Sequence, residues 1–166
     1  MFAVQVKDAI RSTMNLSDMV FRGYLGDLED ADLMRRPGKG CNHLAWQIGH
    51  LVVAEVMMLG GMFPEFKTEL PEGFEEAHHK DNVDCDDASK FNTLAEYLEL
   101  MTKVRANTLA ALEAMDESKL DDPAPEQMRA FCPTVGDMMI LIGTHPMMHA
   151  GQIVPVRREC GKPVMF

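Results

Sequence analysis

Two groups of polar side chains in this chain have the spacing that a metal site built on helices requires. Each group occupies positions i, i+4 and i+7: His43, Gln47 and His50 in the first, and His145, His149 and Gln152 in the second. Residues at this spacing project from one face of an α-helix, with β-carbons of neighbouring turns about 5–6 Å apart. Two imidazoles one turn apart can therefore bind one ion at about 2.1 Å, and a histidine from a facing helix would complete three ligands. Such a set leaves a coordination position open for water or substrate.

The spacing alone leaves two interpretations open. In the first, Gln47 and Gln152 hydrogen-bond to ligand imidazoles or to a bound water and so orient a metal site. In the second, the same glutamines and histidines form a buried hydrogen-bonded network without metal, which fixes the register of two helices. His43 stands at the predicted start of its helix and is interpreted as a surface or capping residue rather than as a ligand.

Other residues with metal-binding chemistry are interpreted as structural. Glu55 lies about 140° from His50 around a helix of 100° per residue, which makes it a poor ligand to the same ion. His78 and His79 lie in an acidic stretch and are expected to be part of a solvated loop. Four methionines flank the second histidine group, but adjacent helical positions point about 100° apart, so core packing is favoured over a copper site.

Four predicted helices position these residues. Apolar residues at three- and four-residue steps predict amphipathic helices over about residues 4–28 and 94–116. Residues 43–59 and 134–158 carry apolar side chains in nearly every direction and are predicted to be buried on most sides. The pattern therefore predicts an all-α protein, an antiparallel four-helix bundle in which the two apolar helices turn their histidines toward each other or toward a shared cleft.

Local signals set the predicted ends of these helices. Asn42 is a credible N-cap for the second helix, and Gly60-Gly61 is expected to end it. Capping boxes are predicted at Thr93 and at Thr134. Two prolines, at positions 146 and 155, remove amide donors from the fourth helix, so we expect a kink or a local irregularity there.

The connection between the second and third helices is strongly acidic. Residues 61–90 hold nine acidic and three basic side chains, so they carry −6 of the chain's net charge of −10. We expect this connection to lie over one end of the bundle as a lid. Its charge would disfavour anionic substrates, although only within a Debye length of about 8–10 Å.

The composition bounds the class of protein. The chain has 166 residues, 46 % of them hydrophobic and 25 % charged, which predicts one globular domain over residues 1–166. An excess of 26 acidic over 16 basic side chains argues against nucleic-acid binding. Four dispersed cysteines without a CxxC pair, and a start without a signal-peptide pattern, predict a reduced cytoplasmic protein with no membrane association.

Three stretches of the sequence resemble the DinB family, also called the DinB/YfiT-like bundles, and together they span nearly the whole chain. They are residues 28–37, where an acidic helix exit runs into Arg-Pro; residues 42–55, NHLAWQIGHLVVAE; and residues 145–163, HPMMHAGQIVPVRRECGKP. The joint pattern, a histidine followed about 95 residues later by HxxxHxGQ, is far more specific than either half. Pro146 in the ligand helix, and Ala150 where a basic residue is frequent, depart from the pattern.

The resemblance implies a four-helix bundle with a divalent-metal site whose ligands are His50, His145 and His149. Zn²⁺, Ni²⁺ and iron all suit such ligands. Members of the family include transferases that use a low-molecular-weight thiol, and homodimers are common. We therefore expect a metal-dependent hydrolase or thiol transferase with a small-molecule substrate; the alternative is a metal-binding or ligand-sensing bundle without turnover. No residue is clearly placed as a general base.

Overall fold

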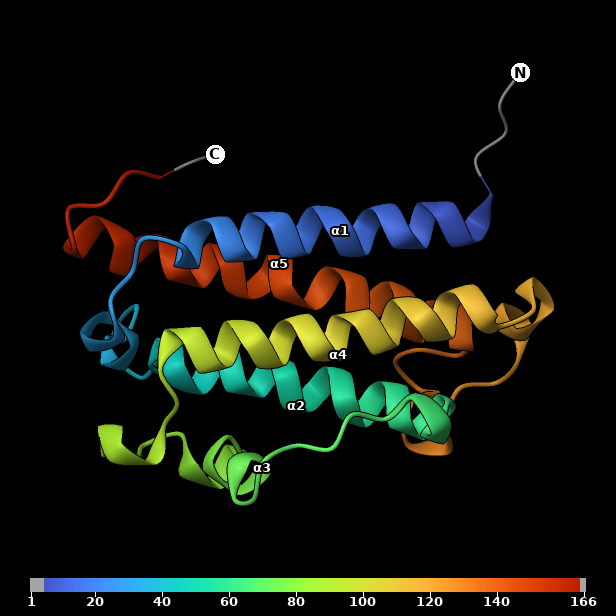
Figure 1. Ribbon diagram of the computed structural model, residues 1–166, viewed down its shortest axis with the longest axis horizontal. Coiled ribbons are helices and arrows are strands. Elements are labelled where there is room, and N and C mark those ends of the chain that lie inside the picture. Colours follow the sequence, from blue (N-terminus) through green and yellow to red (C-terminus); the bar gives the residue numbers. More distant parts are fainter. Residues whose placement is uncertain (1–4, 165–166) are drawn as a thin grey trace.

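Four long helices lie side by side in the computed structural model, which describes residues 5–164 (Figure 1). The helices are α1 (Val6–Leu25), α2 (Leu44–Met62), the short α3 (Phe74–Ala77), α4 (Leu94–Ala114) and α5 (Val135–Glu159). The described residues contain no β-strand. The prediction of an all-α helix bundle is confirmed.

The directions of the helices differ in part from a fully antiparallel bundle. Neighbours α1 and α4 run antiparallel, as do α2 and α5, whereas α1 and α5 run parallel, as do α2 and α4 (Figure 1). Hydrogen bonds agree with these directions, because Lys7 near the start of α1 donates to the carbonyls of Glu113 and Met115 at the end of α4. The reason is the long connection between α2 and α4, which returns along the bundle before α4 begins.

Capping explains where the helices begin. Both predicted capping boxes are present, with Thr93 and Glu96 at α4 and with Thr134 and Asp137 at α5. The predicted cap of α2 is wrong by one residue, because His43, not Asn42, is the N-cap and its Nδ1 accepts a hydrogen bond from the amide of Trp46. The ring of His43 is completely buried, so it is a capping residue but not a surface one.

Glycine does not end α2 where the sequence predicts, whereas α5 runs through its two prolines to the predicted end. Helix α2 continues through Gly60-Gly61 to Met62, and α5 is continuous through Pro146 and Pro155. A proline at position 146 cannot donate to the carbonyl one turn earlier. One residue beyond the carbonyl affected, the hydroxyl of Ser17 donates to the carbonyl of Gly143, and this bond joins α1 to α5.

The acidic connection packs along the side of the bundle and does not cover one end of it. It contains α3 and several short 3₁₀ turns, and Figure 1 places it beside α2. Asn107 of α4 donates to Thr68 at 2.8 Å, Trp46 of α2 donates to the carbonyl of His79 at 3.2 Å, and Arg36 pairs with Asp86. These bonds attach both halves of the connection to the helices.

His78 is one of the most deeply buried residues of the connection. Its ring is 2 % exposed and lies over Gly49 of α2, where an added β-carbon would stand 2.0 Å from the ring. One ring nitrogen lies 2.7 Å from the carbonyl oxygen of Phe74 and the other 2.7 Å from the hydroxyl of Tyr97. The prediction that His78 belongs to a solvated loop is therefore wrong, although His79 is exposed as expected.

Burial of His78 makes the stability of the fold depend on pH. Burial lowers the pKa of His78 from 6.5 to about 4, so the unfolded chain takes up a proton between these values before the folded one does. The stability that comes from burying a neutral His78 is therefore fully present above pH 6.5 and is lost as the pH falls toward 4. The free energy of unfolding should drop by about 2 kcal/mol between pH 7.5 and 5.0 for this reason. Urea unfolding should show that a His78→Gln variant loses less stability than the wild type over this interval, by about this amount. Parallel pH dependences of the two proteins would contradict the assignment.

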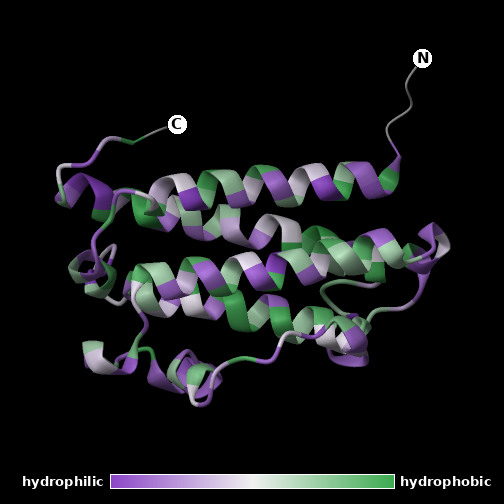
Figure 2. Ribbon diagram, in the orientation of Figure 1, coloured by the Kyte–Doolittle hydropathy of each residue, from purple (hydrophilic) through white to green (hydrophobic). Residues whose placement is uncertain are grey.

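The apolar core lies between the four long helices and is richest along α2, the most hydrophobic ribbon in Figure 2. Helix α2 is long and apolar enough to cross a membrane, but 56 % of its most apolar window is buried inside the protein, as is typical of a core helix. The predicted core role of the methionines holds for Met138 and Met139. It is wrong for Met147 and Met148, which are exposed.

Candidate metal centre

The structure brings together three of the histidines singled out in the sequence. His50 of α2 and His145 and His149 of α5 each offer one nitrogen, and these atoms all lie within 4.8 Å of one another. The ring centroids are 5.3 Å apart for His50 and His145, 5.6 Å for His50 and His149, and 5.0 Å for the pair on α5. Antiparallel packing of the two apolar helices thus produces the convergence that their spacing predicts.

This arrangement fits a divalent metal ion. Nitrogens bound at about 2.1 Å in tetrahedral geometry are about 3.4 Å apart, a spacing within the observed limit. His50 and His145 are half-buried and His149 is buried, so the three rings reach from the interior toward the surface. The candidate ligands are therefore partly exposed at His50 and His145 and enclosed at His149.

The rings are kept in the neutral form that binds metal. Burial lowers the pKa of His145 and of His149 to about 4, and the neighbouring histidines add to the effect. Burial also lowers the pKa of His50. Because metal ligation requires a free lone pair on imidazole, these shifts reduce competition from protons near neutral pH.

Gln47 orients His149. The Oε1 atom of Gln47 lies 3.0 Å from Nδ1 of His149, and the amide nitrogen of Gln47 donates to the carbonyl of Asn42 at 2.8 Å. Because Oε1 can only accept, Nδ1 of His149 carries the proton and Nε2 is left with the lone pair that can bind metal. The suggested role of Gln47 as a partner of a ligand imidazole therefore has the expected geometry.

Replacing Gln47 with methionine is expected to weaken Zn²⁺ binding by about 10- to 100-fold, the usual cost of losing a hydrogen-bonding partner of a ligand. The cause would be loss of the acceptor that fixes the tautomer and orientation of His149. Competition titration with a chromophoric chelator measures the affinity. Gln127→Met, at an exposed position, is the matched control and should bind as the wild type does. Equal affinities of the two variants would exclude this role.

Trp46 is a part of the site that the sequence did not reveal. Its ring stacks on His50 with centroids 4.8 Å apart and planes 7° apart, and its Nε1 donates to the carbonyl of His79. Trp46 precedes His50 by one helical turn, a spacing that predicts a shared face but not a stack. Through Trp46 the acidic connection is joined to the ring of His50.

The other candidate residues lie outside the cluster. Nε2 of His43 contacts the carbonyl of Cys85, and Nδ1 caps the start of α2, so neither nitrogen is available to the cluster. Glu55 binds Arg105 and Thr108 in the bundle interior, in agreement with the prediction that it is no ligand. Gln152 is exposed and is no ligand, but its side chain hydrogen-bonds to His149, as suggested from the sequence, and this bond raises the pKa of His149 against the effect of burial.

Comparisons with known proteins agree with this fold. The family model of the DinB superfamily matches residues 15–153. A solved structure, described as the conserved protein of locus from Enterococcus faecalis, superposes with a TM-score of 0.70 at 18 % sequence identity. The match covers 96 % of this chain and 100 % of the other. At this identity the likeness is one of fold. No curated protein matches the sequence.

Proposed function

The chain belongs to the DinB superfamily, and from this premise we propose that it binds one divalent metal ion through His50, His145 and His149. The observation that carries the proposal is the convergence of three neutral imidazole nitrogens from two helices within 4.8 Å. Zn²⁺, Ni²⁺ or Fe²⁺ suits three imidazoles. Three protein ligands leave at least one coordination position for water or for a small-molecule substrate.

We propose that this centre serves a metal-dependent enzyme, either a hydrolase or a transferase that uses a low-molecular-weight thiol. A divalent ion bound here would lower the pKa of a bound water or thiol and act as a Lewis acid. The protein's own contribution is to hold the imidazoles neutral, to fix the tautomer of His149 through Gln47, and to shield one side of the site with Trp46. The half-buried rings of His50 and His145 leave an approach from the surface.

One observation favours the alternative, a metal-binding or ligand-sensing bundle without turnover. Among the described residues, the clustered side chains with ligand chemistry are histidines only. The nearest acidic residue of α2 in sequence, Glu55, is bound to Arg105 in the interior and cannot serve as a base at the site. A proton acceptor would then have to come from the substrate or from a bound hydroxide.

Metal binding at this centre can be tested with the single tryptophan of the chain as a probe. Because Trp46 stacks on His50, Ni²⁺ bound at the cluster should quench its fluorescence in a saturable, one-to-one titration. Excess Zn²⁺ should displace Ni²⁺ and reverse the quenching. Quenching that is linear in Ni²⁺ concentration, or that persists in excess Zn²⁺, would exclude a site beside Trp46.

The two functional alternatives are separated by an activity screen of the metal-loaded protein. Ester and amide substrates test for hydrolysis, and an electrophile with each low-molecular-weight thiol tests for transfer. Turnover that disappears on chelation and returns on reloading supports the enzyme. Stoichiometric metal without turnover in either arm would support the non-catalytic bundle.

A further inference from the structure

A cluster of charged and polar side chains lies inside the bundle, away from the histidines. Glu55 of α2 accepts hydrogen bonds from two residues of α4, Arg105 at 2.9 Å and Thr108 at 2.7 Å. The Glu55 and Arg105 side chains are only 12 % and 9 % exposed. Burial raises the pKa of Glu55, and Arg105 opposes that rise. The pair thus joins α2 to α4 in a region of low dielectric.

Arg105 is incompletely paired by the protein. Only Nη2 reaches Glu55, and the buried Nε and Nη1 atoms have no hydrogen-bond partner among the described residues. A buried donor without a partner costs the full desolvation of its N–H group, so native proteins supply a partner for nearly all of them. The two donors therefore indicate a ligand that accepts hydrogen bonds.

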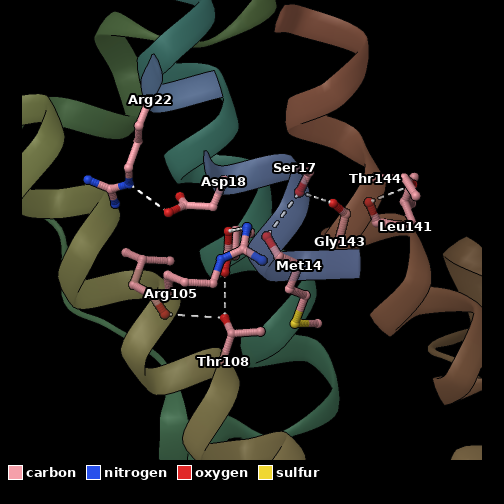
Figure 3. Close-up of polar contacts among 11 residues, drawn as sticks. Met14, Ser17, Asp18, Arg22, Arg105, Thr108, Leu141, Gly143 and Thr144 are labelled. Atoms are coloured by element: carbon pink, nitrogen blue, oxygen red, sulfur yellow. Dashed lines mark hydrogen bonds and ion pairs between the residues drawn. The ribbon is translucent and has the colours of Figure 1, made fainter. Parts of the chain in front are cut away.

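A small crevice stands beside these donors. Its cavity volume is about 10 Å³, and its polar lining comes from Asp18 of α1, Glu55 and Arg105. Apolar side chains from three helices form the rest of the lining: Leu51, Val52, Met101, Val104 and Pro146. Asp18 also binds Nε of Arg22 through Oδ2, which leaves Oδ1 as an acceptor (Figure 3). A cavity of about 10–15 Å³ is the size that one water molecule needs.

The charges around the crevice select a neutral occupant. Two carboxylates, Asp18 and Glu55, are each paired with a guanidinium, of Arg22 and Arg105, so the surroundings carry no net charge that would bind an ion. Arg105 can only donate and the Asp18 carboxylate can only accept, so the occupant must do both. Water is the molecule of this size that accepts from one partner and donates to the other.

We propose that one ordered water molecule occupies this crevice, accepts a hydrogen bond from Arg105 and donates one to Asp18. The water links α1 to the Glu55–Arg105 pair, so that three of the four long helices share one hydrogen-bonded cluster. Two lining residues, Leu51 and Pro146, are sequence neighbours of His50 and His145. The crevice and the histidine cluster therefore share two helices, α2 and α5. The hydration of the crevice is independent of whether the histidines bind metal.

Two measurements test the hydration site. In a crystal structure of the wild-type protein, a water peak is expected about 2.7–3.2 Å from Nε or Nη1 of Arg105. In solution, ¹⁷O magnetic relaxation dispersion should show one fewer long-lived water in Asp18→Leu than in the wild type. Asp18→Asn retains an acceptor and should keep this water. Asp8→Leu, at an exposed position of the same helix, is the matched control and should also keep it.

A direct Arg105–Asp18 ion pair without intervening density would overturn the proposal. So would a bound ion in the crevice, or a dispersion amplitude in Asp18→Leu equal to that of the wild type. If Asp18→Leu does not fold, the wild-type crystal structure alone decides.

Discussion

Replacing His145 with alanine is expected to lower the affinity of the protein for Zn²⁺ by more than about 100-fold. This exceeds the 10- to 100-fold cost of losing a residue that only orients a ligand, and it corresponds to more than about 2.7 kcal/mol. The ring of His145 contributes one of three convergent nitrogens, and two histidines cannot complete the set. Because His145 is half-buried, its removal should leave the helical circular dichroism unchanged.

The matched control is His79→Ala. His79 is exposed, and the bond it makes to Trp46 uses its backbone carbonyl, which the substitution retains. Metal content after dialysis, measured by mass spectrometry, should be one equivalent in the wild type and the control and near zero in His145→Ala. Equal metal in both variants would show that the ion is bound elsewhere and would refute the proposed centre.

The candidate site was predictable from the sequence to the extent that it depends on helical spacing. His145 and His149 share a face because they are four residues apart, and the apolar character of both helices predicts that they pack together. The spacing could not say which histidine of α2 faces α5. His50 does so, while His43 is turned aside because it caps the helix.

Contacts between distant segments were not predictable in this way. The sequence around His78 is acidic and contains glycine, so it resembles a solvated loop, yet the absence of a side chain at Gly49 creates space for the imidazole. Tyr97, far along the chain, supplies the hydrogen bond that makes this burial tolerable. No local periodicity encodes such a match between three segments.

The Glu55–Arg105 pair is a second contact between distant segments that the sequence did not predict. A glutamate and an arginine on predicted helices are expected on solvated faces, because charged side chains are rarely buried unless paired. Parallel packing of α2 and α4 places them opposite each other, and this direction depends on the path of the acidic connection. The pairing follows from the topology, which composition does not determine.

Arg105→Met is expected to destabilise the protein by about 3–5 kcal/mol, the cost of leaving one partner of a buried ion pair alone. Glu55 would keep only Thr108 as a partner, and its pKa would rise because the opposing charge is lost. Urea unfolding should show a lower midpoint with an unchanged slope. Lys103→Met, an exposed position on α4, is the control and should change the stability by less than about 0.5 kcal/mol.

The double variant Glu55→Leu with Arg105→Met separates the cost of an unpaired charge from the loss of packing. Replacement of both partners by apolar side chains of similar volume is often neutral or stabilising. We therefore expect the double variant to be more stable than Arg105→Met alone, although one residue more has been changed. Additive losses would instead mean that each side chain contributes through its own packing. In that case the attraction between the charges of Glu55 and Arg105 would not contribute to the packing of α2 against α4.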